Sequence, residues 1–399
     1  INEDMKLPKD LQKEFERVKP IVDLEVGCLR QRRLADMPPL VSQQLHKEAY
    51  LQEALKVKHP FQRQVQIDPD LPEAMFLACL KPNTVIKERK RRYKLLKRIT
   101  VICKPFYEEL RKERPAHGNR VGGAHQPILT AVMSKLMNQN DDPIAIAEGR
   151  EKPTSDDGVA WTSFWGAKVI GRLESSGVMR ANYPKELEKE LLDIKDTNPE
   201  LFIAKMHKLF SNKKPEPGDA TLLTKTYAEL DKKESMLLCL EEIEDFFKKG
   251  QWANMVRFVT WSAEKWREID SGLSSKHNAC TLCEDRILVS SIEMVDTIQY
   301  MTKLMWDTID PRMRSHKYLP TGATEDMSRA YRQVVVEPEG LPYNISVFNE
   351  FENPRYVLLF SLVFGLVASV TEFNRVSLFM RTTLRKFMKM CVDNYFDDF

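Results

Sequence analysis

Two adjacent aspartates, Asp397 and Asp398, follow the aromatic pair Tyr395 and Phe396 at the end of the printed sequence. Ionised neighbours of this kind repel each other and lose solvation together, so they are usually kept for a reason. Carboxylate oxygens are the hard ligands that Mg²⁺ prefers, and a pair at the tip of a strand-turn-strand could seat this ion. The competing interpretation is a solvated chain end, so the pair needs partners elsewhere in the chain.

A third aspartate, Asp326, stands where we expect a strand to end. A short helical turn carrying Ala330 and Tyr331 follows it, and then a β-branched strand over residues 334–336. An acid in this position is a candidate partner for the terminal pair.

A basic hairpin is predicted upstream of these acids. Residues 255–261 are rich in β-branched and aromatic side chains, and residues 265–270 read as the returning strand. Lys265 and Arg267 are two residues apart, so a strand would place them on one face. Arginine suits triphosphate oxygens because its planar fork donates two hydrogen bonds. Two surface cations on an edge strand are the alternative.

A glycine turn is predicted between a buried strand and a helix. Phe364 and Gly365 interrupt the apolar run 356–370, and helical spacing continues over residues 370–389. Gly365 would allow a ligand or template to approach the backbone closely. The apolar run is too short to span a bilayer comfortably, so no membrane partner is expected.

The elements that must position these residues predict an α+β protein. Residues 1–114 read as a helical N-terminal region and residues 115–250 as a helical linker or extension, including helices at 160–173 and 233–249. Residues 251–399 change in character to short strands. We expect a helix-rich N-terminal region followed by a portion with an antiparallel sheet.

Composition limits the other functions. The chain of 399 residues carries a net charge of only +3, so any nucleic-acid contact must rest on local patches. Residues 87–98 hold eight basic side chains in twelve, and could bind phosphates, act as a nuclear-import patch or form a solvated helix face.

The seven scattered cysteines favour free thiols. His277, Cys280 and Cys283 lack the fourth ligand that zinc needs, so ordinary packing is favoured there.

These stretches, in this order, resemble the fingers and palm of a reverse transcriptase. Residues 265–270 (KWREID) resemble the Lys-Trp-Arg-x-x-x-Asp fingers strand, one residue shorter. Residues 326–333 (DMSRAYRQ) resemble the motif that holds the first catalytic aspartate. Residues 364–375 (FGLVASVTEFNR) resemble the PFGLxNAPxxFQR segment of retroelement enzymes, and residues 395–398 (YFDD) resemble the YxDD box. The resemblance covers about residues 255–399.

The resemblance implies nucleotidyl transfer by two metal ions, in which dNTPs are added to the 3′-hydroxyl of a primer on an RNA or DNA template. It makes Asp326 and Asp397 ligands of two Mg²⁺ ions, with Asp398 in support and Mn²⁺ as a substitute. The remaining implied roles concern the nucleotide and the primer. Lys265 and Arg267, with the backbone amides of Ala330 and Tyr331, would bind the triphosphate. The ring of Tyr331 would exclude a 2′-hydroxyl. Phe364 and Gly365 would contact the nucleotide and template, and Tyr395 and Phe396 would touch the primer end.

Departures from the family pattern point to a divergent retroelement. Val363 stands where the family has proline, and Asn374 stands where gypsy-type elements have glutamine. Because the sequence begins at Ile1 and stops at Phe399, we expect a fragment that lacks the thumb and any RNase H, integrase or recombinase domain and is inactive alone. Its location would be intracellular, either cytoplasmic or nuclear.

Two other functions stay open. One is a non-catalytic nucleic-acid-binding retroelement protein, in which residues 1–250 do the binding. The other is a viral RNA-dependent RNA polymerase, although such enzymes generally have a Gly-Asp-Asp box and a second aspartate in their first motif.

Overall fold

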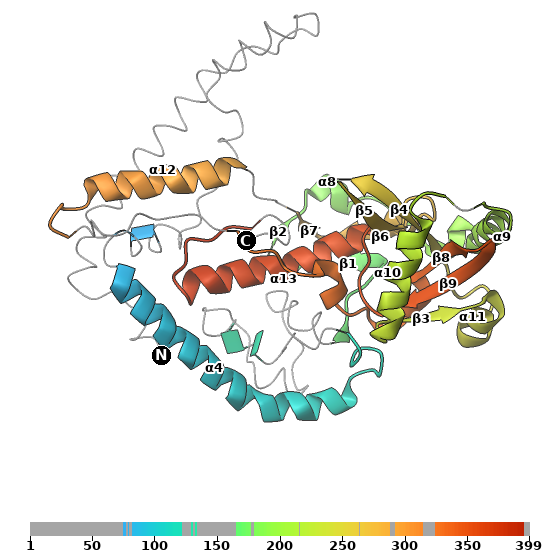
Figure 1. Ribbon diagram of the computed structural model, residues 1–399, viewed down its shortest axis with the longest axis horizontal. Coiled ribbons are helices and arrows are strands. Elements are labelled where there is room, and N and C mark those ends of the chain that lie inside the picture. Colours follow the sequence, from blue (N-terminus) through green and yellow to red (C-terminus); the bar gives the residue numbers. More distant parts are fainter. Residues whose placement is uncertain are drawn as a thin grey trace, which may run out of the picture. The chain divides into compact units, whose positions relative to one another are not determined.

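The computed structural model (Figure 1) describes residues 75–76, 79, 82–121, 129–130, 132–133, 165–176, 179–214, 216–262, 264–287, 292–313 and 324–394. The chain divides into two compact units. The first comprises residues 1–98, 288–326 and 380–399, and the second comprises residues 99–287 and 327–379. Each unit therefore combines segments that are distant in the sequence. The division into regions 1–114, 115–250 and 251–399 stays a prediction.

More of the described residues lie in helices than in strands. The α-helices are α4 (Pro82–Glu113), α8 (Pro184–Leu187), α9 (Pro199–Phe210), α10 (Asp219–Asp231), α11 (Leu240–Phe247), α12 (Ile292–Thr308) and α13 (Val367–Lys386). Short 3-10 turns cover Ile194–Thr197, His277–Cys280, Ala330–Gln333 and Pro338–Tyr343. In the first unit, Met301 and Met305 of α12 pack with Met75 and Phe76 in a fully buried apolar cluster.

The second unit is built on a five-stranded sheet in the order β3-β9-β8-β4-β5. Its strands are β3 (Ser235–Leu238), β4 (Asn254–Ser262), β5 (Lys265–Ser271), β8 (Ile345–Glu350) and β9 (Asn353–Leu359). All neighbouring strands are antiparallel except β4 and β8, which run parallel. The α+β prediction is confirmed, and the expected antiparallel sheet contains one parallel pair.

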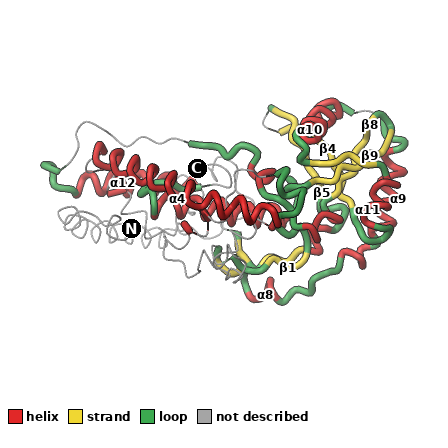
Figure 2. Tube along the Cα trace, turned by 90° about the horizontal axis from the view of Figure 1, so that it is seen from below, coloured by secondary structure: helices red, strands yellow, loops and turns green. Residues whose placement is uncertain are grey.

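Helices cover both faces of this sheet (Figure 2). Ile203 and Met206 of α9 and Ile243 of α11 pack with Val347 and Tyr356 on one face. On the other face, Thr226 and Glu229 of α10 receive hydrogen bonds from Arg257 of β4. The alternation of a strand explains this division, because successive side chains point to opposite faces.

Two small strand pairs connect the unit to α13. β1 (Gly171–Leu173) pairs in parallel with β6 (Thr281–Cys283), and β2 (Arg180–Ala181) pairs antiparallel with β7 (Asp285–Arg286). The buried carboxylate of Asp285 accepts hydrogen bonds from the Ser176 hydroxyl (2.7 Å) and from Nε of Arg375 in α13 (2.8 Å). This buried pair holds the middle of α13 against the small strands.

Two predicted helices and two predicted strands are wrong. Residues 334–336 form only isolated bridges, Val336 with Ala167 and Val335 with Ser361, instead of the predicted strand. Residues 235–238 form β3, and a helix begins only at Leu240. Residues 171–173 form β1, because Gly166 and Gly171 have φ values of +118° and +91° that interrupt a helix. The strand expected before the aspartate pair is absent from the part that the structure describes, since residues 389–394 follow no regular element.

Two general expectations can be compared with the described residues. Within them, no helix is long and apolar enough to cross a membrane. The six described cysteines are all free thiols, as the sequence predicts.

Candidate functional site

The β4–β5 hairpin presents Lys265 and Arg267 to solvent. The two strands pair from Val256 opposite Ser271 to Ser262 opposite Lys265. Lys265 and Arg267 are exposed, whereas Trp266 and Glu268 between and after them are partly buried. The predicted hairpin and its cationic face are therefore both present. The opposite face of β5 carries Asp270, which is fully buried.

The Gly365 turn lies against the end of β5. The N–H of Asp270 donates to the carbonyl oxygen of Phe364 at 2.8 Å. Gly365 has a φ of +132°, and a Cβ there would lie 2.2 Å from the Asp270 carbonyl oxygen and 3.4 Å from the Ile269 side chain. Only glycine permits this approach without displacing backbone. The turn therefore lies against the backbone of β5 at Asp270, and the neighbouring Ile269 shares its strand face with Arg267.

A single asparagine clamps this turn from its other end. Asn278 donates from Nδ2 to the Gly365 carbonyl oxygen (3.1 Å), and its Oδ1 accepts from the N–H of Val367 (2.9 Å). The Asn278 side-chain amide therefore bridges Gly365 and Val367. Val367 is the first residue of α13. Phe364 remains 47% exposed.

The turn Ala330–Gln333 contributes an aromatic side chain to the same region. The Tyr331 ring packs edge-on to Phe364 (5.7 Å between centroids) and to Phe373 (5.2 Å). Ala330 is buried, and its N–H donates to the carbonyl oxygen of Met327 at 3.2 Å. That amide already has a partner within the turn, so triphosphate binding by the Ala330 N–H would have to replace this hydrogen bond.

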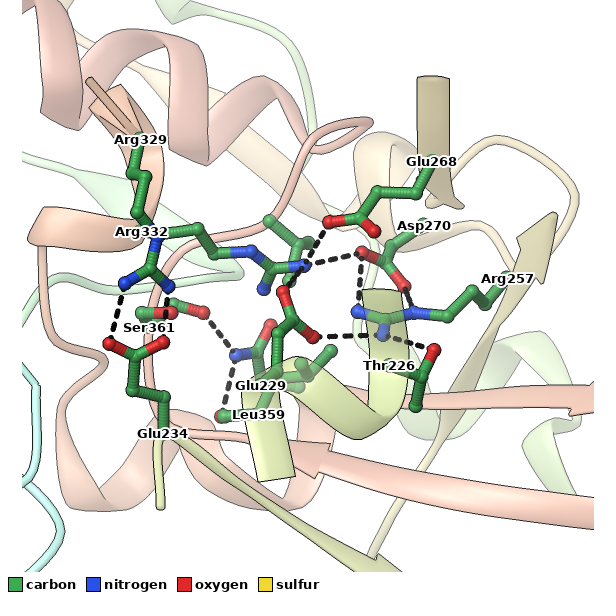
Figure 3. Close-up of polar contacts among 12 residues, drawn as sticks. Thr226, Glu229, Glu234, Arg257, Glu268, Asp270, Arg329, Arg332, Leu359 and Ser361 are labelled. Carbon is green, nitrogen blue, oxygen red and sulfur yellow. Dashed lines mark hydrogen bonds and ion pairs between the residues drawn. The ribbon is translucent and has the colours of Figure 1, made fainter. Parts of the chain in front are cut away.

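A buried network of charges holds the Ala330–Gln333 turn against the β4–β5 hairpin (Figure 3). Arg257 contacts Asp270 from Nε (2.7 Å) and Nη2 (3.1 Å), and Glu229 from Nη1 (3.0 Å). Arg332, next to Tyr331, contacts Glu229 at 2.9 Å and reaches Asp270 and Glu268 at 3.4 Å. Two carboxylates thus lie between two guanidinium groups, which joins α10, the hairpin and the 330–333 turn.

Burial and charge act against each other in this network. Burial alone would raise the pKa of Asp270, but the positive charges of Arg257 and Arg332 outweigh it and hold the pKa below its ordinary value. The pKa of Glu229 is likewise lowered, because Arg332 and Arg257 overcome the effect of burial. Both acids are therefore ionised in the folded protein, and each guanidinium group has a charged partner.

Of the three predicted metal ligands, the described residues include only Asp326. Asp326 is exposed and is assigned to the first unit, whereas Ala330 and Tyr331 belong to the second. Asp397 and Asp398, with Tyr395 and Phe396, lie outside the described residues. Within the described ranges, no group of three or more His, Cys, Asp or Glu side chains could hold a metal ion. The chemistry of the donor set, three carboxylates, is the one that Mg²⁺ prefers.

The sequence interpretation missed the residues that position this site. Arg257, Glu229 and Arg332 were given no role, yet they connect its three parts. One signal for Arg257 was available, because a lone arginine in the apolar strand 255–259 must be paired if that strand is buried. Glu229 and Arg332 carry no comparable signal, since both stand among other charged residues.

Comparison with known proteins adds no relative to this picture. The chain matches no family model, no curated protein and no solved structure.

Proposed function

We propose that this chain forms the fingers and part of the palm of an RNA-directed DNA polymerase of a retroelement. One observation carries the proposal: in the second unit, the Gly365 turn and the aromatic turn at Tyr331 meet at the end of β5, the strand whose other face carries the exposed cations Lys265 and Arg267. A nucleotide needs these three kinds of contact, for its phosphates, its base and its sugar.

The phosphates would be bound by the exposed face of β5. Lys265 and Arg267 project from that face, and guanidinium groups bind phosphate oxygens through strong charge-assisted hydrogen bonds. The hairpin is held by the buried Arg257–Asp270 pair, so the two cations stand on a fixed support. The Gly365 turn packs against the end of β5, and the exposed Phe364 ring beside Gly365 would contact a base or a template strand.

The sugar would be selected by Tyr331. Its ring is held between the rings of Phe364 and Phe373, so it cannot rotate away without losing both contacts. A ring fixed beneath the sugar would clash with a 2′-hydroxyl and favour dNTPs over rNTPs. In the same proposal, Tyr395 and Phe396 would contact the primer end.

Asp326, Asp397 and Asp398 would hold two Mg²⁺ ions, for which Mn²⁺ could substitute. Such ions lower the pKa of the primer hydroxyl and neutralise charge on the leaving pyrophosphate. The protein would supply three hard carboxylate ligands, and Lys265 and Arg267 would bring the triphosphate to them.

Equilibrium binding of a dNTP in the presence of Mg²⁺ tests the proposal directly. Isothermal titration of the 399-residue chain should detect dTTP binding, and Arg267→Gln should weaken it about tenfold or more, as expected for loss of a charged hydrogen bond. Lys208→Gln removes an exposed positive charge from α9 and is the matched control. A folded chain without dTTP affinity, or equal affinity in all three proteins, would reject the nucleotide site.

Primer extension on an RNA template tests the reaction. Asp326→Asn should abolish dNTP incorporation by a protein that extends a primer, while template binding is retained. Undiminished synthesis by that variant would sink the assignment of Asp326 as a metal ligand.

A further inference from the structure

The helix α4 carries two different sides between residues 85 and 99. Val85, Arg92 and Ile99 are buried. An α-helix turns by 100° per residue, so the opposite side holds a stripe of cations within an arc of about 100°. Its members, all exposed, are Lys87, Lys90, Lys94, Lys97 and Arg98, and we call them the basic stripe.

The other cations of this segment have structural partners. Arg89 donates from Nη2 to the carbonyl oxygen of Lys389, and Arg92 donates from Nη1 to that of Phe387, both at 2.7 Å. These carbonyls follow the end of α13, so the two arginines attach α4 to the chain there. Arg91 pairs with Glu88 at 3.5 Å. The basic stripe is the set of exposed cations of this segment that makes none of these contacts.

The charge of this segment is concentrated. Eight basic residues and one acid give residues 87–98 a charge of +7, whereas the whole chain carries +3. The remaining residues therefore carry a net charge of −4, so residues 87–98 are a local concentration of positive charge on a chain that is otherwise net negative. Such a local field attracts a polyanion to one place on the surface.

An aromatic ring borders the basic stripe. Tyr93 is 50% exposed, and Nζ of Lys97 lies 4.6 Å from the centre of its ring. Exposed rings beside lysines form stacking platforms for unpaired bases, whereas a double helix keeps its bases out of reach. The stripe with Tyr93 thus combines contacts for phosphates and for a base.

We propose that the basic stripe and Tyr93 bind single-stranded nucleic acid through its phosphate backbone and one stacked base. From Lys87 to Arg98 the helix rises by about 16 Å. A stacked strand carries one phosphate per about 3.4 Å, so about five phosphates pass along five cations. The proposal does not depend on the polymerase proposal, because its residues are separate from Lys265, Arg267 and Tyr331.

An anionic membrane fits the observations less well. A membrane-bound amphipathic helix inserts an apolar face into the lipid. In residues 85–99 of α4, the apolar residues Val85 and Ile99 are already buried in protein, and the exposed side is mostly basic, with Ile86 as its one exposed aliphatic residue.

Fluorescence anisotropy with a labelled 20-nucleotide single-stranded RNA tests the proposal on the 399-residue chain. The test variant replaces all five stripe cations by glutamine, which has a similar helix propensity. We expect its affinity at 50 mM salt to fall roughly tenfold or more, and the slope of log K against log salt to fall by about 3.5, or 0.7 per cation. Circular dichroism of each variant checks that the helix content is retained.

The matched control removes the same charge elsewhere and should keep the wild-type salt slope. Its changes, at exposed lysines of the second unit, are Lys185→Gln, Lys205→Gln, Lys208→Gln, Lys232→Gln and Lys249→Gln. Equal losses of RNA affinity in the two variants would mean that overall charge alone causes the binding, and would overturn the proposal of a specific site. Unchanged binding in the stripe variant would also overturn it.

Two further measurements separate the sources of binding. Tyr93→Ala should weaken RNA binding about fivefold or more, while Tyr93→Phe keeps the stacking ring and the affinity. Displacement of the RNA by phosphatidylserine vesicles at matched charge would assign the stripe to a membrane and reject the proposal. RNA binding that survives in Arg267→Gln, even where dTTP binding is lost, would support the stripe independently of the nucleotide site.

Discussion

The guanidinium group of Arg257 binds the carboxylate of Asp270 through two contacts, 2.7 Å from Nε and 3.1 Å from Nη2, and both side chains are excluded from solvent. The two residues face each other in the β4–β5 register. The backbone N–H of Asp270 simultaneously binds the carbonyl oxygen of Phe364. One residue therefore connects the hairpin, the buried charges and the glycine turn.

Removing one member of this pair should destabilise the second unit strongly. Arg257→Gln or Asp270→Asn leaves an opposite charge buried with fewer partners, which typically costs about 3–5 kcal/mol. Urea denaturation followed by circular dichroism measures the change. Glu109→Gln is the control, because the Glu109–Lys112 pair is exposed on both sides and is worth at most about 1 kcal/mol. Similar small losses at both pairs would contradict the structural role of Arg257–Asp270.

Glu337 should make stability decrease as pH rises. Burial raises its pKa to about 7, against the positive charge of Lys168 and with the help of the negative Glu339. In the unfolded chain the pKa is about 4.3. Between these values the folded state binds more protons than the unfolded state, so the free energy of unfolding falls as pH rises.

The measurement for Glu337 is the melting temperature at pH 5 and pH 8. Glu337→Gln should reduce the loss of stability between these pH values, because its amide does not titrate. Glu352→Gln changes an exposed residue by the same charge and should keep the wild-type difference. An identical pH profile for wild type and Glu337→Gln would show that Glu337 does not carry the effect.

Some parts of the site follow from the sequence for physical reasons. The hairpin is predictable because β-branched and aromatic residues alternate over 255–270 around a short turn. Helix α13 is predictable from its apolar spacing. The strand β3 is not, because Met236 and Leu237 followed by Leu240 and Ile243 fit a helix, and only pairing with the distant β9 makes residues 235–238 a strand.

Long-range polar contacts are the other part that local patterns cannot supply. In the sequence, Arg332 looks like one more charged residue in a turn. Its structural role depends on the ion pair with Glu229, about a hundred residues earlier in the chain. Asn278 is equally inconspicuous, yet it clamps the Gly365 turn through two hydrogen bonds. Neither contact has a periodicity or motif that would reveal it.

Gly365→Ala should be much more damaging than a glycine change at an open site. The added Cβ would lie 2.2 Å from the carbonyl oxygen of Asp270, in a backbone conformation with φ of +132°. Strain and overpacking together give an expected loss of about 2–5 kcal/mol. Gly171→Ala is the control, because its φ is also positive (+91°) but nothing lies within 4 Å of the new atom. Equal losses in a denaturation experiment would mean that the contact with β5 is unimportant.

Tyr331 should determine which sugar the proposed nucleotide site accepts. Competition between UTP and dTTP for binding measures this selectivity, and Tyr331→Ala should narrow the preference for dTTP by about tenfold, or about 1.4 kcal/mol. Tyr331→Phe keeps the ring between Phe364 and Phe373 and should keep the preference. Phe373→Leu removes one of the rings that hold Tyr331 without touching the sugar site, so it should loosen selectivity less than Tyr331→Ala. Unchanged selectivity in Tyr331→Ala, with dTTP binding intact, would reject the role of the ring and leave the phosphate contacts of Lys265 and Arg267 to be judged separately.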